Sequence, residues 1–117
     1  MSRFCIRRVS SGIKFDLTAA NGQVIASSEV YVTEAACRQG IASVRKAALT
    51  QKTEDQTLPG QKALTNPKYE IYQDKTGQFR FRLKARNGQI IGVSEGYKAK
   101  ASCINGVDSV KENAAVE

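Results

Sequence analysis

The chain has 117 residues, with 18 Lys or Arg, 11 Asp or Glu and no His, so its formal net charge is +7. This length suits one domain with a modest core, and no apolar run approaches the roughly 20 residues that a membrane span needs. Without histidine, a Cys–His nucleophile pair is excluded and a zinc site would need clustered carboxylates that the sequence does not display. We therefore expect a cytoplasmic protein with no metal, no cofactor and no membrane contact.

The first 48 residues predict three strands followed by a helix. Residues 4–9 form a first strand, and a second carries apolar residues at every other position: Ile13, Phe15, Leu17 and Ala19. Asn21-Gly22 predicts a hairpin turn into a third strand at 23–28. The period then changes to about 3.6, with Thr33 as N-cap of a helix whose apolar stripe is Cys37, Ile41, Val44 and Ala48.

Residues 49–67 are polar, contain both prolines and match neither flanking segment, so we expect a linker. A flexible chain of this length has an r.m.s. span of about 24 Å, which lets the flanking units pack side by side.

Residues 68–117 repeat the first unit. The segment from Phe15 to Tyr31 returns from Phe81 to Tyr97 at a constant shift of 66 positions, and the shift continues through the helix. The second unit has strands at 69–73, 79–86 and 89–94. Each copy alone is close to the size at which a core becomes marginal, so we expect the two to share one.

Two registers are possible for the Asn87-Gly88 hairpin. A two-residue turn sets Leu83 opposite Gly92. A three-residue loop with glycine in the bulge sets Leu83 opposite Ile91 and Phe81 opposite Val93, and we expect this register because it buries more apolar surface.

These elements predict an α+β fold made by tandem duplication of a β-β-β-α unit. Residues 1–48 and 68–117 are the repeats and 49–67 the linker, all within one structural domain. The sheet should be antiparallel, with two helices packed on one face and pseudo-twofold symmetry between the copies. Gly40 and Gly106, inside the helices, suggest close packing of helix on sheet.

Several short motifs recur in order: Phe-Arg-Leu-Lys-Ala before Asn-Gly, then Ser-Glu-Gly-Tyr, then Gly-Val-Asp-Ser-Val-Lys-Glu-Asn-Ala. With these motifs the chain resembles the YegP-like family of small bacterial proteins of unknown function. The resemblance covers both copies and implies an α+β fold in which repeats, or two single-repeat chains, join into one symmetric assembly. It implies no activity and brings no catalytic residues.

The residues offer little for catalysis. Cys37 and Cys103 occupy equivalent places in the two stripes and predict reduced, structural thiols. Glu29 and Glu95 lie between a strand and a helix, where a carboxylate can bond free backbone N–H groups. Tyr31 and Tyr97 predict lids over the core. We therefore expect no enzyme.

The best binding candidate is a row of basic residues on the strand at 79–86. Arg80, Arg82, Lys84 and Arg86 alternate with core residues and project about 6.6 Å apart on one face; Lys14 is the main basic residue at the equivalent place in the first copy. Such a row suits phosphates, but aromatics for base stacking are scarce, with Tyr72 the one candidate. We expect a monomeric accessory protein with a protein partner; electrostatic nucleic-acid binding is the alternative.

Overall fold

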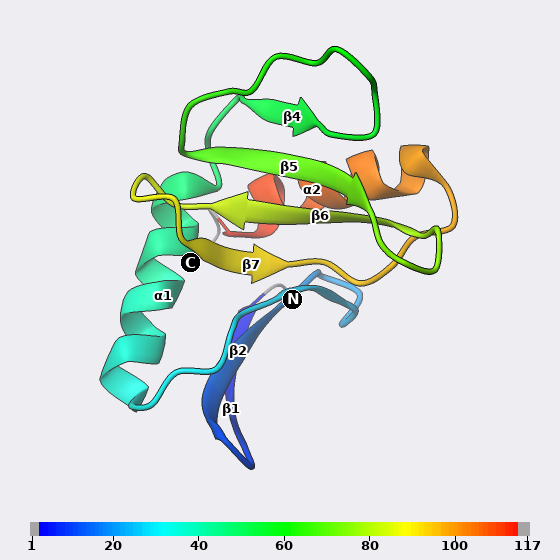
Figure 1. The fold of residues 1–117 in the computed structure, drawn as a ribbon. Helices are drawn as coiled ribbons and strands as arrows, with labels where there is room; N and C mark the ends of the chain where they lie inside the picture. The colour runs from blue at the N-terminus through cyan, green and yellow to red at the C-terminus, as the bar shows by residue number, and fades with distance from the viewer. Residues whose placement is uncertain (1–2, 115–117) are drawn as a thin grey trace.

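The computed structural model describes residues 3–114. They form an α+β fold with one mixed β-sheet and two helices (Figure 1). The β-β-β-α order occurs twice, and an extra strand lies between the copies. In chain order the elements are β1 (Arg3–Val9), β2 (Gly12–Thr18), β3 (Val24–Ser27), α1 (Glu34–Ala47), β4 (Thr53–Asp55), β5 (Lys68–Gln73), β6 (Phe79–Lys84), β7 (Ile90–Val93) and α2 (Lys100–Ala114).

The seven strands have the order β1-β2-β3-β7-β6-β5-β4, so the last strands of the two repeats meet in the middle. They are joined by one residue pair, Ser27 with Val93, which are equivalent positions in the repeat. The β1–β2 hairpin is strongly twisted away from the other strands (Figure 1). The junction is therefore the most sparsely hydrogen-bonded part of the sheet.

The expected register of the second hairpin is wrong beyond its loop. The three-residue loop is present, since the Ala85 N–H donates to the Gln89 carbonyl oxygen at 2.9 Å. Between Leu83 and Lys84 the register then shifts, which sets Leu83 opposite Gly92. The bulge turns the side chain of Ile91 into the core, where it is 4% exposed. The first repeat has the same shift between Leu17 and Thr18.

The segment at 49–67 is more than a linker. Its residues Thr53–Asp55 form β4, which pairs in parallel with β5, so the expected all-antiparallel sheet is wrong and the sheet is mixed. β4 lies along the outer side of β5 in Figure 1. Its three residues show no apolar alternation, and backbone pairing and side-chain contacts with β5 position it instead.

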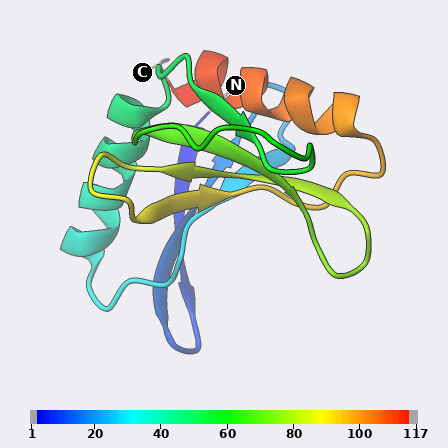
Figure 2. The same ribbon diagram turned by 45° about the horizontal axis from the view of Figure 1, so that its top comes forward.

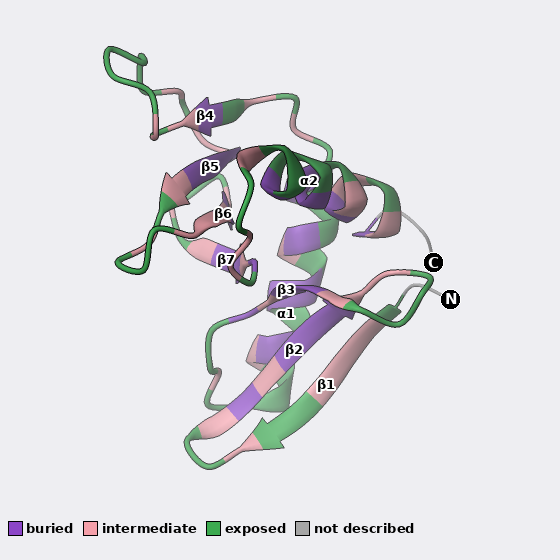
Figure 3. Cartoon of the chain, turned by 90° about the vertical axis from the view of Figure 1, so that its right-hand side faces the viewer, coloured by how far each residue is buried: buried purple, intermediate pink, exposed green. Residues whose placement is uncertain are grey.

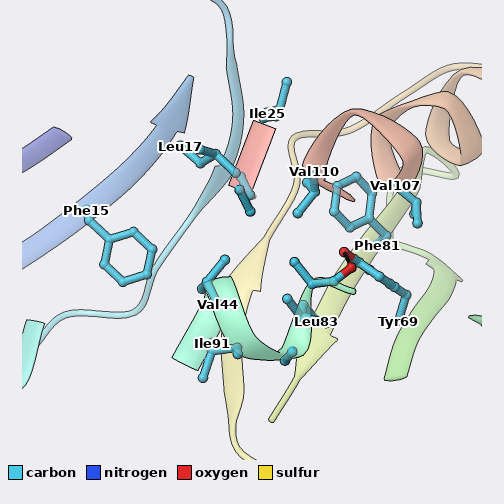
Figure 4. Close-up of a cluster of buried hydrophobic side chains, with 14 of the residues drawn as sticks. Phe15, Leu17, Ile25, Val44, Tyr69, Phe81, Leu83, Ile91, Val107 and Val110 are labelled. Atoms are coloured by element: carbon cyan, nitrogen blue, oxygen red, sulfur yellow. Dashed lines mark hydrogen bonds between the residues drawn. The ribbon is translucent and has the colours of Figure 1, made fainter. Parts of the chain in front are cut away.

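The apolar residues of strands and helices form one cluster that includes both repeats. Phe15 and Leu17 come from β2, and Phe81 and Leu83 from β6 (Figure 4). Each helix packs on its own repeat and also on strands of the other, α1 on β6 and β7 and α2 on β2 and β3. Figure 2 shows both helices against the sheet. Neither of the two described helices is long and apolar enough to cross a membrane.

The helix glycines allow this close packing. A Cβ built on Gly106 would lie 2.7 Å from the Tyr97 hydroxyl oxygen and 2.9 Å from the Phe81 ring. A Cβ on Gly40 would overlap the Tyr31 hydroxyl in the same way. The tyrosines thus lie over the point where helix and strand meet. Thr33 caps α1 as expected, because its side chain accepts a hydrogen bond from the Ala36 N–H at 3.1 Å.

Gly106→Ala should destabilise the protein by about 1–2 kcal/mol, because overpacking outweighs the better helix propensity of alanine. Adding Tyr97→Phe removes the nearest atom, so the double variant should recover part of the loss. Denaturant midpoints of the variants measure both effects. A Gly106→Ala variant that is more stable than wild type would contradict close packing at this position.

Candidate functional site

The expected basic row lies on the face of the sheet opposite the helices, which we call the open face. Arg80, Arg82 and Lys84 project from β6 between the buried residues Phe81 and Leu83. All three are partly buried. Arg86 lies past the end of β6, is exposed, and lines a separate hollow of about 480 Å³ with Lys46 of α1. The row therefore contains three neighbouring cations instead of four.

Acidic side chains on the same face hold these three cations. Arg80 Nε donates to Asp74 Oδ2 at 2.8 Å, and Arg82 Nε donates to Glu70 Oε1 at 2.6 Å. Lys84 Nζ lies 3.4 Å from the other oxygen of Glu70. The Cζ atom of the Arg82 guanidinium lies 4.4 Å from the centre of the Tyr72 ring. This tyrosine therefore reaches the open face, but the guanidinium covers its ring, so it is not free to stack on a base.

A buried ion cluster continues from the row to β4. Lys68 Nζ lies 2.6 Å from Glu54 Oε1 and 3.0 Å from Glu70 Oε2, and all three residues are buried. The side chain of Gln56 and the Leu64 N–H also donate to Glu54. These hydrogen bonds, the Gln56 bond first and the Lys68 bond second, lower the pKa of Glu54 to about 2. The cluster fixes β4 on β5.

Lys14 lines a groove at the repeat junction, and Arg80 of the row lines the same groove. The groove has a volume of about 650 Å³ and is lined from both repeats, with Lys14, Arg7 and Asp16 on one side and Arg80 and Glu95 on the other. Lys14 and Arg80 are equivalent positions, 66 residues apart. The structure thus brings together two of the residues predicted for the candidate contact, Lys14 and Arg80.

Arg7 and Asp16 were missed as site residues. Arg7 Nε donates to Asp16 Oδ2 at 2.7 Å, and the Ser27 hydroxyl donates to Asp16 Oδ1 at 2.6 Å. Burial acts to raise the pKa of Asp16, but the bonds from Arg7 and Ser27 and the charges of Arg7 and Lys14 outweigh it, so the pKa is lowered. Asp16 therefore stays ionised. The available signal was its position in the repeat, because Asp16 is equivalent to Arg82 of the basic row.

The Ser-Glu corners have a different structural role from the expected one. Glu29 and Glu95 are exposed and lie five residues before the helices begin, so they do not cap them. The serines make the contacts. The Phe81 N–H donates to Ser94 Oγ at 2.9 Å, and that hydroxyl donates to the Glu95 carbonyl oxygen at 2.8 Å. Ser28 makes the same two bonds in the first repeat.

The other groups with possible chemistry are buried. Burial raises the pKa of the Cys103 thiol to about 11 and that of Cys37 above its ordinary value, so both stay protonated near neutral pH. A protonated thiol is a poor nucleophile and a poor metal ligand. Within residues 3–114, no three His, Cys, Asp or Glu side chains come together as a metal site.

Comparison with known proteins supplies the family. The model of a domain of unknown function, DUF1508, matches the chain twice, at residues 10–55 and 74–117. The chain belongs to this family. One match falls in each half of the chain: the first begins after β1 and runs through β4, the second begins after β5, and residues 56–73 lie outside both. The resemblance to YegP-like proteins is confirmed, and the family's function is unknown.

The relatives include long and short proteins. The UPF0339 protein MS1092 of Mannheimia succiniciproducens is 44% identical over 101 residues, 86% of this chain and 76% of that protein. A UPF0339 protein of Methanosarcina acetivorans is 64% identical over 47 residues, 40% of this chain but 81% of its own length, so that protein is about half as long as this chain. The matched part spans 41% of a relative from Stutzerimonas stutzeri, which is 70% identical over 46 residues.

Two solved structures share the fold. The solution structure of yegP from E. coli has a TM-score of 0.81 and 32% identity, and covers 99% of this chain and 88% of its own. The UPF0339 protein SO3888 from Shewanella oneidensis has a TM-score of 0.80 and 31% identity, covering 98% and 86%. The first is described as a protein of unknown function.

The buried carboxylate of Glu54 predicts a pH dependence. Its folded pKa of about 2 lies below the ordinary 4.5, so its contribution to stability is complete above about pH 4.5 and is lost as the pH falls toward 2. Glu54→Gln should cost about 1–3 kcal/mol at pH 7 and show a smaller loss of stability between pH 5 and 2.5 than wild type. Urea unfolding across this range measures both.

The matched control is Glu112→Gln, which removes an exposed carboxylate of α2. Its stability at pH 7 should stay within about 0.5 kcal/mol of wild type. Equal stability of Glu54→Gln and wild type at pH 7 would show that the buried cluster does not hold β4.

Proposed function

We propose that the chain is a non-enzymatic, monomeric binding protein, and that the groove at the repeat junction receives an acidic segment of a partner protein. The observation that carries the proposal is the pair Lys14 and Arg80, which present cations to one groove from equivalent positions of the two repeats. Arg7 adds a third cation to the groove, and Asp16 and the exposed Glu95 add two negative charges. The size of the groove, about 650 Å³, suits a few side chains of a peptide.

The paired positions support a pseudo-twofold arrangement, which is part of the proposal. From the β3–β7 junction, the strands follow in the order β3, β2, β1 in one direction and β7, β6, β5 in the other. The one residue pair that joins the halves, Ser27 with Val93, unites equivalent positions. A groove on such an axis would present similar chemistry to a partner from both sides, with Lys14 on one and Arg80 on the other.

The ion pairs favour a protein partner over nucleic acid. Glu70 and Asp74 neutralise much of the basic row, so a nucleic-acid backbone laid along β6 would meet few free cations there. None of the described residues that line the groove is aromatic, whereas proteins that bind single strands stack bases on aromatic side chains. A short acidic peptide needs no stacking, and its carboxylates can bond Lys14 and the partly exposed Arg7.

Binding of a fluorescent hexaglutamate peptide at 50 mM salt tests the proposal. We expect saturable binding that Lys14→Glu weakens about tenfold, because the substitution replaces a groove cation by an anion. Lys75→Glu makes the same charge change at an exposed turn outside the groove and should alter affinity less than twofold. Fluorescence anisotropy gives each affinity.

A fluorescent (dT)16 oligonucleotide serves as the comparison ligand in the same buffer. Binding of the oligonucleotide with no binding of the peptide would overturn the proposal in favour of the nucleic-acid alternative. Equal losses in Lys14→Glu and Lys75→Glu would also overturn it, because net charge and not the groove would then determine affinity.

A further inference from the structure

The outer edge of β1 is open, although the equivalent edge in the second repeat is covered by a strand. β4 covers the outer edge of β5, whereas the equivalent strand β1 is paired only with β2 among the described residues. The equivalence follows from the registers: Phe4 lies opposite Leu17 as Tyr69 lies opposite Leu83, and Leu83 is Leu17 shifted by 66. Figure 3 shows β1 as the outermost strand on its side of the sheet.

We infer that the outer edge of β1 is a docking site for an extended segment of a partner protein, which adds to the sheet as a parallel strand in the way that β4 adds to β5. The inference supposes a protein partner, as the proposed function does, but it concerns a different surface. Neither Arg3 nor Glu34, the two charged residues on which it depends, lines the groove.

The backbone of β4 shows which groups of β1 are available. The Tyr69 N–H donates to the Lys52 carbonyl oxygen at 3.0 Å, and the Ile71 carbonyl oxygen accepts from the Gln56 N–H at 2.8 Å. Because β1 pairs with β2 in the register of β5 with β6, the Phe4 N–H and the Ile6 carbonyl oxygen point away from β2 in the same manner. They can form the same ladder with an added strand.

The open-face side of the added strand should carry an acidic residue. In β4 that residue is Glu54, which pairs with Lys68. The residue of β1 equivalent to Lys68 is Arg3, which is exposed. The residue equivalent to Glu70 is Cys5, so β1 itself places no second carboxylate beside Arg3, and Asp16 on the neighbouring strand is already bonded to Arg7.

On the side that faces the helices, the added strand should carry a positive charge, where β4 carries the negative charge of Asp55. Asp55, the next residue of β4, pairs with Lys100, the first residue of α2. The first residue of α1 is Glu34, at the equivalent position. Its existing ion pair with Arg38 is exposed on both sides and therefore weak. A lysine in the docked segment fits this place, so β1 selects an extended segment with adjacent Glu and Lys.

The same charges argue against a second copy of the chain as the occupant. The β4 segment of another copy would bring Asp55 against Glu34. Two β1 edges pairing with each other would bring the exposed Arg3, Arg7 and Arg8 of both copies together. Self-assembly through β1 is therefore disfavoured, while a Glu-Lys segment of a different protein is accepted.

Two peptides test the inference by NMR titration of the isotope-labelled full chain. The first has the sequence of residues 51–57, and the second carries Asp55→Lys in that sequence. We expect the Lys peptide to bind about fivefold more tightly, to shift the signals of β1, and to slow hydrogen exchange of the Phe4 amide. Arg3→Glu should weaken its binding about fivefold, whereas Lys75→Glu should not change it.

Two further controls separate strand addition from simple charge attraction. Glu34→Lys should reverse the preference, so that the unchanged 51–57 peptide binds more tightly than the Lys peptide. A Lys peptide N-methylated at the position of Gln56 cannot donate to the Ile6 carbonyl and should lose binding. Equal binding of the methylated peptide, no shifts at β1 at millimolar peptide, or self-association that Arg3→Glu abolishes would each overturn the inference. None of these outcomes depends on the groove, which the Lys14→Glu experiment tests by itself.

Discussion

The structure depends on one apolar layer that the two repeats bury together. Each repeat is near the size at which a lone core is marginal, and one residue pair joins the halves of the sheet. Backbone hydrogen bonding cannot hold the repeats together at such a junction. The helices do so, because α1 packs on β6 and β7 while α2 packs on β2 and β3.

This constraint explains the location of the groove. The core requires the helix-facing sides of β2 and β6 to be apolar and closely packed under Gly40 and Gly106. It places no such demand on the open face, where the sparse β3–β7 pairing leaves space between the hairpins. Charged residues can occupy that space without loss of core packing. Lys14 and Arg80 consequently face one groove although they are far apart in the sequence.

The sequence predicts the elements well where side-chain periodicity is strong. Alternation predicts β2 and β6, and Thr33 predicts the start of α1, because local patterns determine these features. β4 could not be predicted in this way. Its residues are polar, and its position depends on Lys68, 14 residues after Glu54. The register shifts that follow the hairpin loops were also missed. An extra residue in the strand lets the consecutive residues Ile91 and Gly92 both be buried, which strict alternation does not allow.

The candidate site was predicted in part for a related reason. Alternation on one strand predicts that Arg80, Arg82 and Lys84 share a face, but their charge partners come from other segments. Glu70 becomes the partner of Arg82 only through the β5–β6 register, which the turn after Gln73 determines. The sequence therefore overestimates the free positive charge of the row.

The differences between the copies now have a structural explanation. Asp16 occupies the place of Arg82, and Cys5 the place of Glu70, so the cross-strand pair of the second repeat is absent from the first. Asp16 instead pairs with Arg7, which lies at the place of Tyr72. In the second repeat this chemistry stabilises an edge that β4 already covers. In the first it leaves Arg3 and the edge of β1 exposed, so the two repeats keep one core but differ in what their outer strands can bind.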